Sequence, residues 1–565
     1  MRFKDLKDML KQTEEKYGDK TAFILQEKDG IREVTHKQFR KDVNSLGTAF
    51  IEMGLKGKKI AVISENRYEW EVSYLAVAAG TGIIVPLDKA LPENEIESLI
   101  IRSEVEAIVY SNKYDEAMAN IQKQGNTKLK YFISMDLEEN EFNKYSFKKV
   151  LKQGRELLEA GNTQFLDSEI DNEKMGIMLF TSGTTAMSKA VMLSHKNICA
   201  NIESITKAFS QMDETDRLLS FLPLHHTFEC TVGFLFIVSI GACIVFSKGV
   251  RHIGEELKKF KITAMICVPV VYEKMYLKLI KGIESQGKMP TVKKGVAISN
   301  ILSKVGIDVK KRLFHEIHAN LGGQIKLMVA GGAALNPEVE KGFNELGFNV
   351  AQGYGLTETS PVVAAEYDKK KKIGSIGRAI PGVEVKLDDI DSATGVGELL
   401  VKGDSVMLGY YENEEANKET FTEDGWLRTG DYAKIDKDGY IFISGRKKFV
   451  IVLQNGKNVY PEEIETLIDN SPLVSECMVY GAEDKDGDYT ISVKVVYDKD
   501  YIKEKFGELT EQEIHDIIWK EIKIVNRTMP KYKWVKSLII TDKEFEKTTT
   551  HKIKRKVETE KILQE

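Results

Sequence analysis

The sequence is poor in the residues that build disulfide-rich or fibrous proteins. It contains 5 cysteines and 11 prolines among 565 residues. The cysteines are scattered through apolar runs and never have the Cys-x-x-Cys spacing, which excludes a disulfide framework or a zinc site and is typical of buried thiols in a reducing compartment. Since 43 glycines and 42% hydrophobic residues accompany the few prolines, collagen-like, low-complexity and disordered chains are excluded too.

A long hydrophobic run and an excess of one charge are also absent. The longest apolar stretch, 231–246, is shorter than the roughly 20 residues of a membrane span, and it predicts a buried helix followed by a strand. The formal net charge is −5, so no basic field steers the chain onto nucleic acid. The N-terminus lacks the pattern of a signal peptide. These absences predict a cytoplasmic protein without a transmembrane segment or a nucleic-acid partner, and they leave peripheral membrane contact and oligomeric state open.

The pattern of apolar residues predicts an α/β fold. In two series, at 59–135 and 217–353, short apolar runs alternate with amphipathic ones, which indicates two doubly wound βαβ halves. Short β-like runs at about 373–445 predict a small β subdomain. The remaining residues, 446–565, predict a compact, mobile α+β domain. We therefore expect a large N-terminal domain at 1–445 and a small C-terminal domain at 446–565.

One loop has the composition of a phosphate-binding site. Residues 178–197 read MLFTSGTTAMSKAVMLSHKN, in which an apolar strand runs into small and hydroxyl residues and then Lys189. Backbone N–H groups, hydroxyls and an ammonium group suit phosphate oxygens, although a Ser/Thr/Gly loop by itself is more often a surface connection. The loop is not GxxxxGK[ST]. A near match to that pattern at 282–289, GIESQGKM, lacks the final Ser or Thr and is expected to open no helix, so we dismiss it.

The loop resembles the phosphate loop of the adenylate-forming superfamily, which includes acyl-CoA synthetases, nonribosomal adenylation domains and firefly luciferase. Four further segments resemble the other motifs of this superfamily in the family order: LPLHHTFE at 222–229, QGYGLTET at 352–359, WLRTGD at 426–431 and GRKKFVIVLQNGKNVYPEEIE at 445–465. A single motif has a substantial false-positive risk, but five in order along the whole chain identify it as a member of the superfamily.

The resemblance implies an ATP site assembled from several motifs. The residues implied to bind the phosphates are Thr181, Ser182, Gly183, Thr184, Thr185 and Lys189. Those implied to bind adenine and the rest of the nucleotide are Gly331, Gly332, Ala333, Gln352, Gly353, Tyr354, Gly355 and Thr357. Mg²⁺ would be held by Glu358 and Thr184, since it prefers oxygen ligands.

The resemblance also assigns roles in the later motifs. Asp431 and Arg446 would bind the ribose, Lys448 would be the hinge, and Gly456 would face the thiol of coenzyme A. Lys552, in EKTTTHKIKRK near the C-terminus, would stabilise developing charge during adenylation. The residues implied to be catalytic are Lys552, Thr357, Glu358 and His226.

The phosphate loop departs from the family pattern at three positions. Where the pattern is TTGxPKG, this chain has Ala186, Ser188 and Ala190. If either glycine of the pattern takes positive φ, an alanine there is strained by about 1 kcal/mol. Nucleotide binding is therefore better supported than fast turnover.

The activity implied by the resemblance is that of an AMP-forming acyl-CoA ligase. Its partners would be a medium- or long-chain fatty acid, ATP with Mg²⁺, and coenzyme A, because the motifs resemble those of bacterial long-chain fatty acid–CoA ligases. Two alternatives stay open. One is a fatty acyl-AMP or acyl-carrier-protein ligase, and the other is a nucleotide-binding regulatory protein of the same fold.

Overall fold

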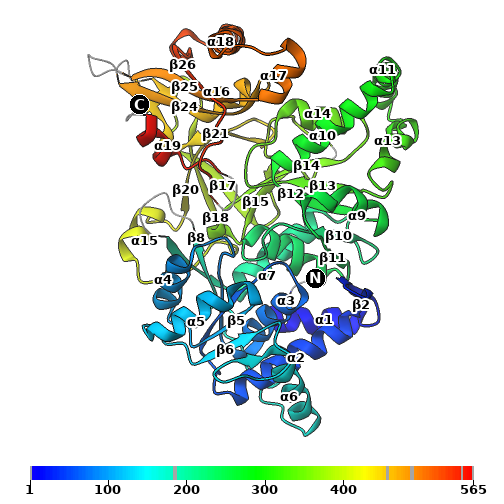
Figure 1. Cartoon of the computed structure of the whole chain (residues 1–565), viewed down its shortest axis with the longest axis vertical. Helices are drawn as coiled ribbons and strands as arrows, with labels where there is room; N and C mark the ends of the chain where they lie inside the picture. Colours follow the sequence, from blue (N-terminus) through cyan, green and yellow to red (C-terminus); the bar gives the residue numbers. More distant parts are fainter. Residues whose placement is uncertain are drawn as a thin grey trace. The chain divides into compact units, whose positions relative to one another are not determined.

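The computed structural model describes residues 3–181, 188–368, 370–453, 457–483, 489–548 and 552–562. Within them the chain forms two compact units. The first contains the chain up to residue 181 together with 188–384 and 401–421, and the second contains 385–400 and the residues from 422 onward. Figure 1 shows the order of the elements along the chain.

Two large sheets form the first unit, each with a parallel centre and antiparallel pairs at an edge. The order of the nine-stranded sheet is β16 (Arg378–Ala379), β15 (Val362–Ala365), β14 (Val350–Gly355), β13 (Leu327–Ala330), β12 (Ala264–Cys267), β10 (Arg217–Ser220), β11 (Cys243–Phe246), β1 (Thr21–Glu27), β2 (Gly30–Thr35). That of the eight-stranded sheet is β19 (Gly409–Tyr410), β9 (Lys189–Ser194), β8 (Met175–Thr181), β4 (Ile83–Pro86), β3 (Lys59–Ile63), β5 (Ala107–Tyr110), β6 (Tyr131–Ser134), β7 (Tyr145–Ser146).

The central strands are buried on both faces because helices cover the sheets. Every residue of β5, β11, β12 and β13 is buried, as expected of parallel strands between helical layers. The predicted buried helix and strand at 231–246 are confirmed as η3 (Phe228–Leu235), α8 (Phe236–Ser239) and β11. The other helices of this unit are α1 (Leu6–Tyr17), α2 (His36–Glu52), α3 (Tyr68–Ala76), α4 (Glu93–Ser103), α5 (Asp115–Gln124), α6 (Phe147–Glu159), α7 (His195–Ala208), α9 (Ile253–Lys259), α10 (Pro269–Ser285), α11 (Met289–Lys304), α12 (Lys310–Leu313), α13 (His315–Asn320), α14 (Pro337–Glu345) and α15 (Glu414–Thr420).

One expectation about this region is wrong. The segment after Gly287 opens a helix, because α11 begins at Met289 with Pro290 in its first turn. Proline is tolerated there since the first N–H groups of a helix have no partner within it. The dismissal of a nucleotide loop still holds, because Gly282 lies inside α10 and not after a strand.

The second unit contains smaller sheets and its own core. A four-stranded sheet has the order β17 (Val383–Asp388), β18 (Gly397–Gly403), β20 (Leu427–Ile435), β21 (Ile441–Arg446). The first residues of β17 and the last residues of β18 are grouped with the first unit. The remaining strands and helices are β22 (Ile451–Val452), β23 (Asn458–Val459), β24 (Val474–Glu483), β25 (Tyr489–Tyr497), β26 (Ser537–Thr541), α16 (Pro461–Ile468), α17 (Lys499–Phe506), α18 (Glu511–Arg527) and α19 (Arg555–Ile562). The second compact unit includes residues 422–445 together with the residues that follow. The predicted domain boundary between 445 and 446 therefore stays a prediction.

The cysteines have the buried environment that the sequence predicts. All five cysteines are free and buried. Among the described residues, no helix is both long and apolar enough to cross a membrane.

Candidate functional site

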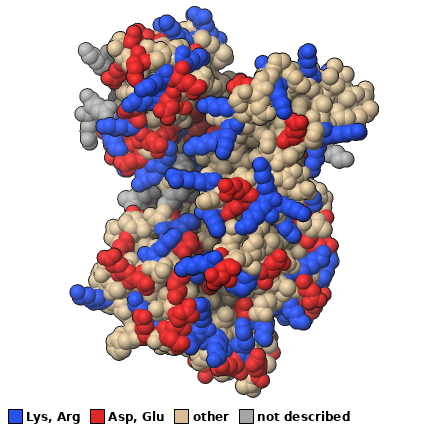
Figure 2. Space-filling model, turned by 45° about the vertical axis from the view of Figure 1, so that its right-hand side comes forward, with Lys and Arg blue, Asp and Glu red and all other residues tan. Residues whose placement is uncertain are grey.

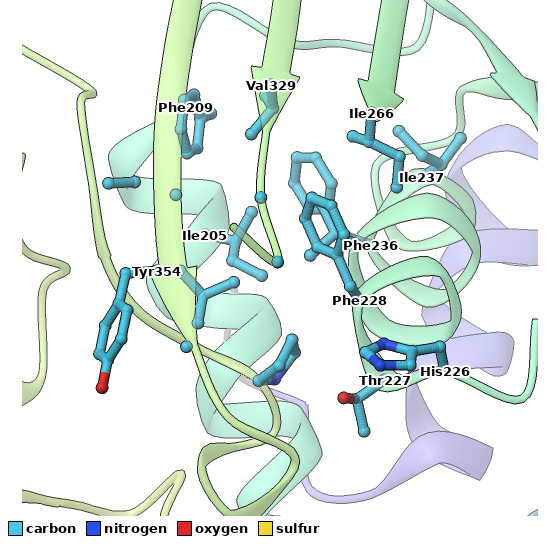
Figure 3. Close-up of a pocket in the computed structure, with 18 of the residues that line it drawn as sticks. Ile205, Phe209, His226, Thr227, Phe228, Phe236, Ile237, Ile266, Val329 and Tyr354 are labelled. Atoms are coloured by element: carbon cyan, nitrogen blue, oxygen red, sulfur yellow. The ribbon is translucent and has the colours of Figure 1, made fainter. Parts of the chain in front are cut away.

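An apolar cavity of the first unit runs along β12 and β13 and reaches the carboxyl ends of β12, β13 and β14, the edge where ligands bind in open α/β sheets. Its empty volume is about 820 Å³, part of which is open solvent. Side chains from these strands, from α7 and from η3 line it, as Figure 3 shows. None of the lining residues carries a charged side chain.

The cavity brings together many of the residues implied by the resemblance. Those that line it are His226, Gly331, Gly332, Gly353, Tyr354, Gly355 and Thr357. Gly331 follows β13 and packs against an aromatic ring, because a Cβ atom there would lie 2.8 Å from the ring of Phe228. Gly332 has φ +84°, a conformation that favours glycine. Ala333 follows as an exposed residue and is not part of the lining.

The side chain of Gln352 is buried and forms hydrogen bonds with residues that follow β13. Its side chain accepts a hydrogen bond from the N–H of Leu335 at 3.0 Å and donates to Glu340 Oε2 at 2.9 Å. The residue is 4% exposed. The side chain of Gln352 therefore connects the loop after β13 to Glu340 through hydrogen bonds.

Thr357 and Glu358 lie on a single 3₁₀ turn, η5 (Thr357–Thr359). The hydroxyl of Tyr410 donates a hydrogen bond to Glu358 Oε1 at 2.8 Å. The Lys189 ammonium lies over the ring of the same tyrosine, 4.7 Å from its centroid. Burial, and then the negative charge of Glu358, raise the pKa of Tyr410 far above its ordinary value, so the phenol stays a hydrogen-bond donor.

The sequence analysis missed Tyr410. It lies on β19, which pairs with β9 so that Tyr410 stands opposite Val191. This pairing of distant segments brings the tyrosine to both Lys189 and Glu358. The only local signal was a Gly-Tyr pair in a β-like region.

The predicted phosphate loop is described at its two ends. Thr181 ends β8 and Lys189 begins β9, and the two residues are cross-strand partners. The predicted residues Ser182, Gly183, Thr184 and Thr185, and the substituted Ala186, lie outside the described residues.

The other two substituted positions of the loop have distinct surroundings. Ser188 is held by Arg102, whose guanidinium donates to its hydroxyl at 3.0 Å and to its carbonyl. Ala190 lies within β9 opposite Phe180, and it is not among the residues with positive φ. The strain expected of an alanine at 190 therefore has no basis.

Glu229 and Glu71 are carboxyl groups buried behind the cavity wall. Both side chains belong to fully buried residues, Glu229 on η3 and Glu71 on α3. Glu229 accepts a hydrogen bond from the hydroxyl of Ser220. Burial raises the pKa of Glu229 to about 8, and burial together with the charge of Glu229 raises the pKa of Glu71. Burial therefore favours the protonated form of both carboxyl groups.

The second unit contains the remaining predicted residues. Asp431 on β20 and Arg446 on β21 are cross-strand partners, and Arg446 Nε lies 2.8 Å from Asp431 Oδ1. Partial burial and the charges of Arg446 and Lys552 lower the pKa of Lys448 to about 8. Gly456 lies outside the described residues.

Two family models match most of the chain. Residues 10–411 match the AMP-binding enzyme model, and residues 448–565 match the model of the AMP-binding enzyme C-terminal domain. The chain belongs to the AMP-binding enzymes. The resemblance to the adenylate-forming superfamily is thereby confirmed.

Curated relatives of this AMP-binding enzyme act with different acyl acceptors. It is 26% identical to a chloroplastic long-chain-fatty-acid–acyl-carrier-protein ligase of Arabidopsis thaliana, with 92% of this chain and 80% of that protein covered. It is 28% identical to a long-chain-fatty-acid–CoA ligase of Mycobacterium bovis, with 80% and 76% covered.

Solved structures share the fold of this AMP-binding enzyme. ATP-bound MatB from Rhodopseudomonas palustris has a TM-score of 0.76 at 23% identity, with 99% of both chains covered. A Mycobacterium tuberculosis fatty acyl CoA synthetase has a TM-score of 0.67 at 21% identity, with 99% of this chain and 98% of that chain covered. The predicted fold class, a large α/β N-terminal domain and a smaller C-terminal one, is confirmed.

Proposed function

We propose that this AMP-binding enzyme is an AMP-forming fatty acyl-CoA ligase. The observation that carries the proposal is the cavity of the first unit, which is lined by apolar side chains and has polar groups only where the family motifs meet it. A long alkyl chain is stabilised in such a cavity by about 0.8 kcal/mol for each buried methylene group. A charged or hydrogen-bonding acyl chain would find no partners there.

The polar groups of the lining set the direction in which a fatty acid binds. His226, Thr227 and Thr357 supply polar side chains from the family motifs, whereas Phe209, Met212 and Leu218 are apolar lining residues outside these motifs. A carboxylate loses solvation unless it meets polar groups. We therefore place the carboxylate at His226 and Thr357 and the alkyl chain among the apolar residues.

The residues on η5 and β9 suit MgATP. One oxygen of Glu358 is held by Tyr410, and a carboxylate has about four lone-pair sites, so the group can still ligate a hard cation such as Mg²⁺. Among the described residues no group of three or more His, Cys, Asp and Glu side chains could hold a metal, so phosphate oxygens and water would complete the ligand set. When bound, Mg²⁺ neutralises phosphate charge. Lys189 and Thr181 would bind the phosphates, and Asp431 and Arg446 the ribose.

The proposed reaction has two steps. A carboxylate oxygen attacks the α-phosphorus of ATP, the bond to pyrophosphate breaks, and an acyl-adenylate forms. The sulfur of coenzyme A then attacks the acyl carbon, and AMP leaves with the electron pair of the broken C–O bond. Thr357 and Lys552 would stabilise the negative charge that develops at the phosphate in the first step.

A panel of fatty acids assayed for AMP and acyl-CoA tests the proposal. We expect AMP and a thioester in equal amounts with free coenzyme A. Release of pyrophosphate with a thioester formed only on an acyl carrier protein would favour the second candidate, which the relative from Arabidopsis thaliana supports. A protein that binds ATP but releases no pyrophosphate with any acid would be the regulatory alternative.

A further inference from the structure

The helical segment 269–313 of the first unit is strongly basic. It contains ten Lys and Arg residues against three Asp and Glu, whereas the whole chain has a net charge of −5. The segment forms α10, α11 and α12. Positive charge is therefore concentrated in one region of an acidic protein.

Helix α11 has an inner face and an outer face. Gly295 and Ser299 are buried, and Val292 and Val296 pack against the core of the first unit. On the opposite side, residues at spacings of four, three and four form an outer stripe, which continues one position past the end of the helix. The stripe consists of Lys294, Ile298, Ile301 and Val305.

The apolar side chains of this outer stripe are unusually exposed. Ile298 is 55% exposed, Ile301 66% and Val305 71%, and Ile307 in the following turn is 51% exposed. Single exposed apolar residues are normal on protein surfaces, but a cluster marks an interaction site. We call Ile298, Ile301, Val305 and Ile307, with Lys293, Lys294 and Lys304, the α11 surface.

Basic side chains border the apolar part of the α11 surface. Lys293, Lys294 and Lys304 are exposed, and within the described chain they form no ion pair, whereas Lys288 lies 2.8 Å from Glu316. Helix α11 lies at the upper right of Figure 1. In Figure 2 the upper right part of the molecule is mainly uncharged surface with basic side chains beside it.

We propose that the α11 surface binds an anionic phospholipid bilayer. The isoleucine and valine side chains would enter the boundary between headgroups and acyl chains, as the apolar face of an interfacial helix does. The lysines would extend their ammonium groups to the lipid phosphates. The proposal goes beyond the proposed ligase activity and does not depend on it.

A second copy of the chain fits the α11 surface less well. In a two-fold symmetric contact the same patch meets itself. Lys293, Lys294 and Lys304 of the two copies would then approach one another, and like charges in an apolar contact repel strongly. An anionic bilayer instead supplies the opposite charge and the apolar phase together.

Co-sedimentation of the full-length protein with vesicles tests this surface. We expect it to bind phosphatidylcholine vesicles that contain phosphatidylglycerol, and to bind pure phosphatidylcholine vesicles at least about fivefold less well. High salt should weaken the binding, because surface charges are screened. Lys293→Glu/Lys294→Glu and Ile298→Ser/Ile301→Ser should each reduce binding about tenfold or more.

Matched controls come from α18 in the second unit. Ile524 is 55% exposed, like Ile298, and Lys520 and Lys523 lie on the same helix. Ile524→Ser and Lys520→Glu/Lys523→Glu should leave vesicle binding unchanged. If they reduce it as much as the α11 variants do, the binding is a general charge effect and the proposal is wrong.

Two further measurements separate the outcomes. With Ile301→Trp, vesicles of brominated lipid should quench the added fluorescence if the side chain enters the bilayer, and no quenching would contradict insertion. AMP formation that requires a fatty acid, measured without vesicles, should be unchanged in the α11 variants. Loss of membrane binding can therefore be distinguished from failure of the ligase proposal. If the variants instead abolish a concentration-dependent dimer seen by sedimentation velocity, the occupant is a second copy and the bilayer proposal fails.

Discussion

Tyr410 joins two parts of the candidate site that belong to different motifs. Its ring lies under the Lys189 ammonium and its hydroxyl holds Glu358. Tyr410 is not among the residues assigned to bind ATP or the fatty acid, so we regard it as a positioning residue. Its effect should appear where the orientation of Glu358 matters, which is the binding of MgATP.

Tyr410→Phe tests this positioning role. Removing the hydroxyl deletes a hydrogen bond to a charged group, which is worth about 1.5 to 3 kcal/mol, so we expect the rate of pyrophosphate release to fall roughly tenfold or more and its dependence on Mg²⁺ to shift to higher concentration. Tyr411→Phe is the matched control, because its hydroxyl meets Lys59 instead. Equal effects of the two variants would remove the special role of Tyr410.

Lys552→Ala tests the predicted catalytic lysine. It should abolish acyl-adenylate formation and spare thioester formation from pre-made acyl-adenylate, because the ammonium acts on the first transition state only. The neighbouring exposed residue Lys554 provides the control variant Lys554→Ala. Pyrophosphate release and thioester formation, measured separately, give the answer, and equal loss in both steps would place the catalytic charge elsewhere.

At the scale of the element, the β8–β9 pair changes how the substituted loop is interpreted. Ala190 is a strand residue of β9, so alanine suits it better than glycine does. Ala190→Gly should therefore lower the free energy of unfolding by about 0.5 to 1 kcal/mol and should not raise the adenylation rate. Any rate gain from restoring glycine should come from Ala186→Gly. A faster Ala190→Gly enzyme in a pyrophosphate assay would contradict this assignment.

The helix η3 contains a carboxyl group whose ionisation opposes folding. Because the pKa of Glu229 is about 8 in the folded protein and its ordinary value is 4.5, the folded state binds more protons between these values. The contribution of Glu229 to stability is therefore full below about pH 4.5 and falls as the pH rises to about 8, by a few kcal/mol.

Glu229→Gln should remove this part of the pH dependence. The amide keeps an acceptor for the Ser220 hydroxyl and cannot ionise, so the variant should have a higher urea midpoint than the wild type above pH 8 and a similar one near pH 5. Urea midpoints across the pH range measure this. Glu256→Gln, another buried glutamate of the first unit, is the control. A difference in midpoint between Glu229→Gln and wild type that does not change with pH would contradict the raised pKa of Glu229.

At the scale of the whole molecule, the resemblance implies that the C-terminal part moves between the two steps of the proposed reaction. The resemblance places the hinge at Lys448, in the short 3₁₀ turn after Arg446. Few residues absorb the φ/ψ change of such a motion. Restricting φ at the hinge should therefore affect one reaction step more than the other.

Lys448→Pro tests the hinge, because proline holds φ near −65°. We expect it to slow thioester formation far more than adenylation, or the reverse if the restricted conformation is that of the second step. Lys437→Pro, in the turn between β20 and β21, is the control. The two half-reactions measured separately decide: a uniform loss, or none, would argue against Lys448 as the pivot.

The sequence alone predicted the features that are local along the chain. Alternating apolar runs predicted most strands and helices of the βαβ series, and five motifs in order predicted the superfamily. Both signals depend on residues that are close together in the sequence. The cavity residues of these motifs, such as Tyr354 and Thr357, were found in the same way.

Only the tertiary structure decided which distant residues meet. Tyr410 reaches Lys189 and Glu358 through a strand pairing that no local pattern encodes. Gln352 was assigned to the nucleotide by its motif, yet its side chain is used by hydrogen bonds beneath the loop after β13. The outer stripe of α11 became visible only when burial showed which face packs on the core. Periodicity determines that a helix has two faces, whereas packing determines which face remains exposed.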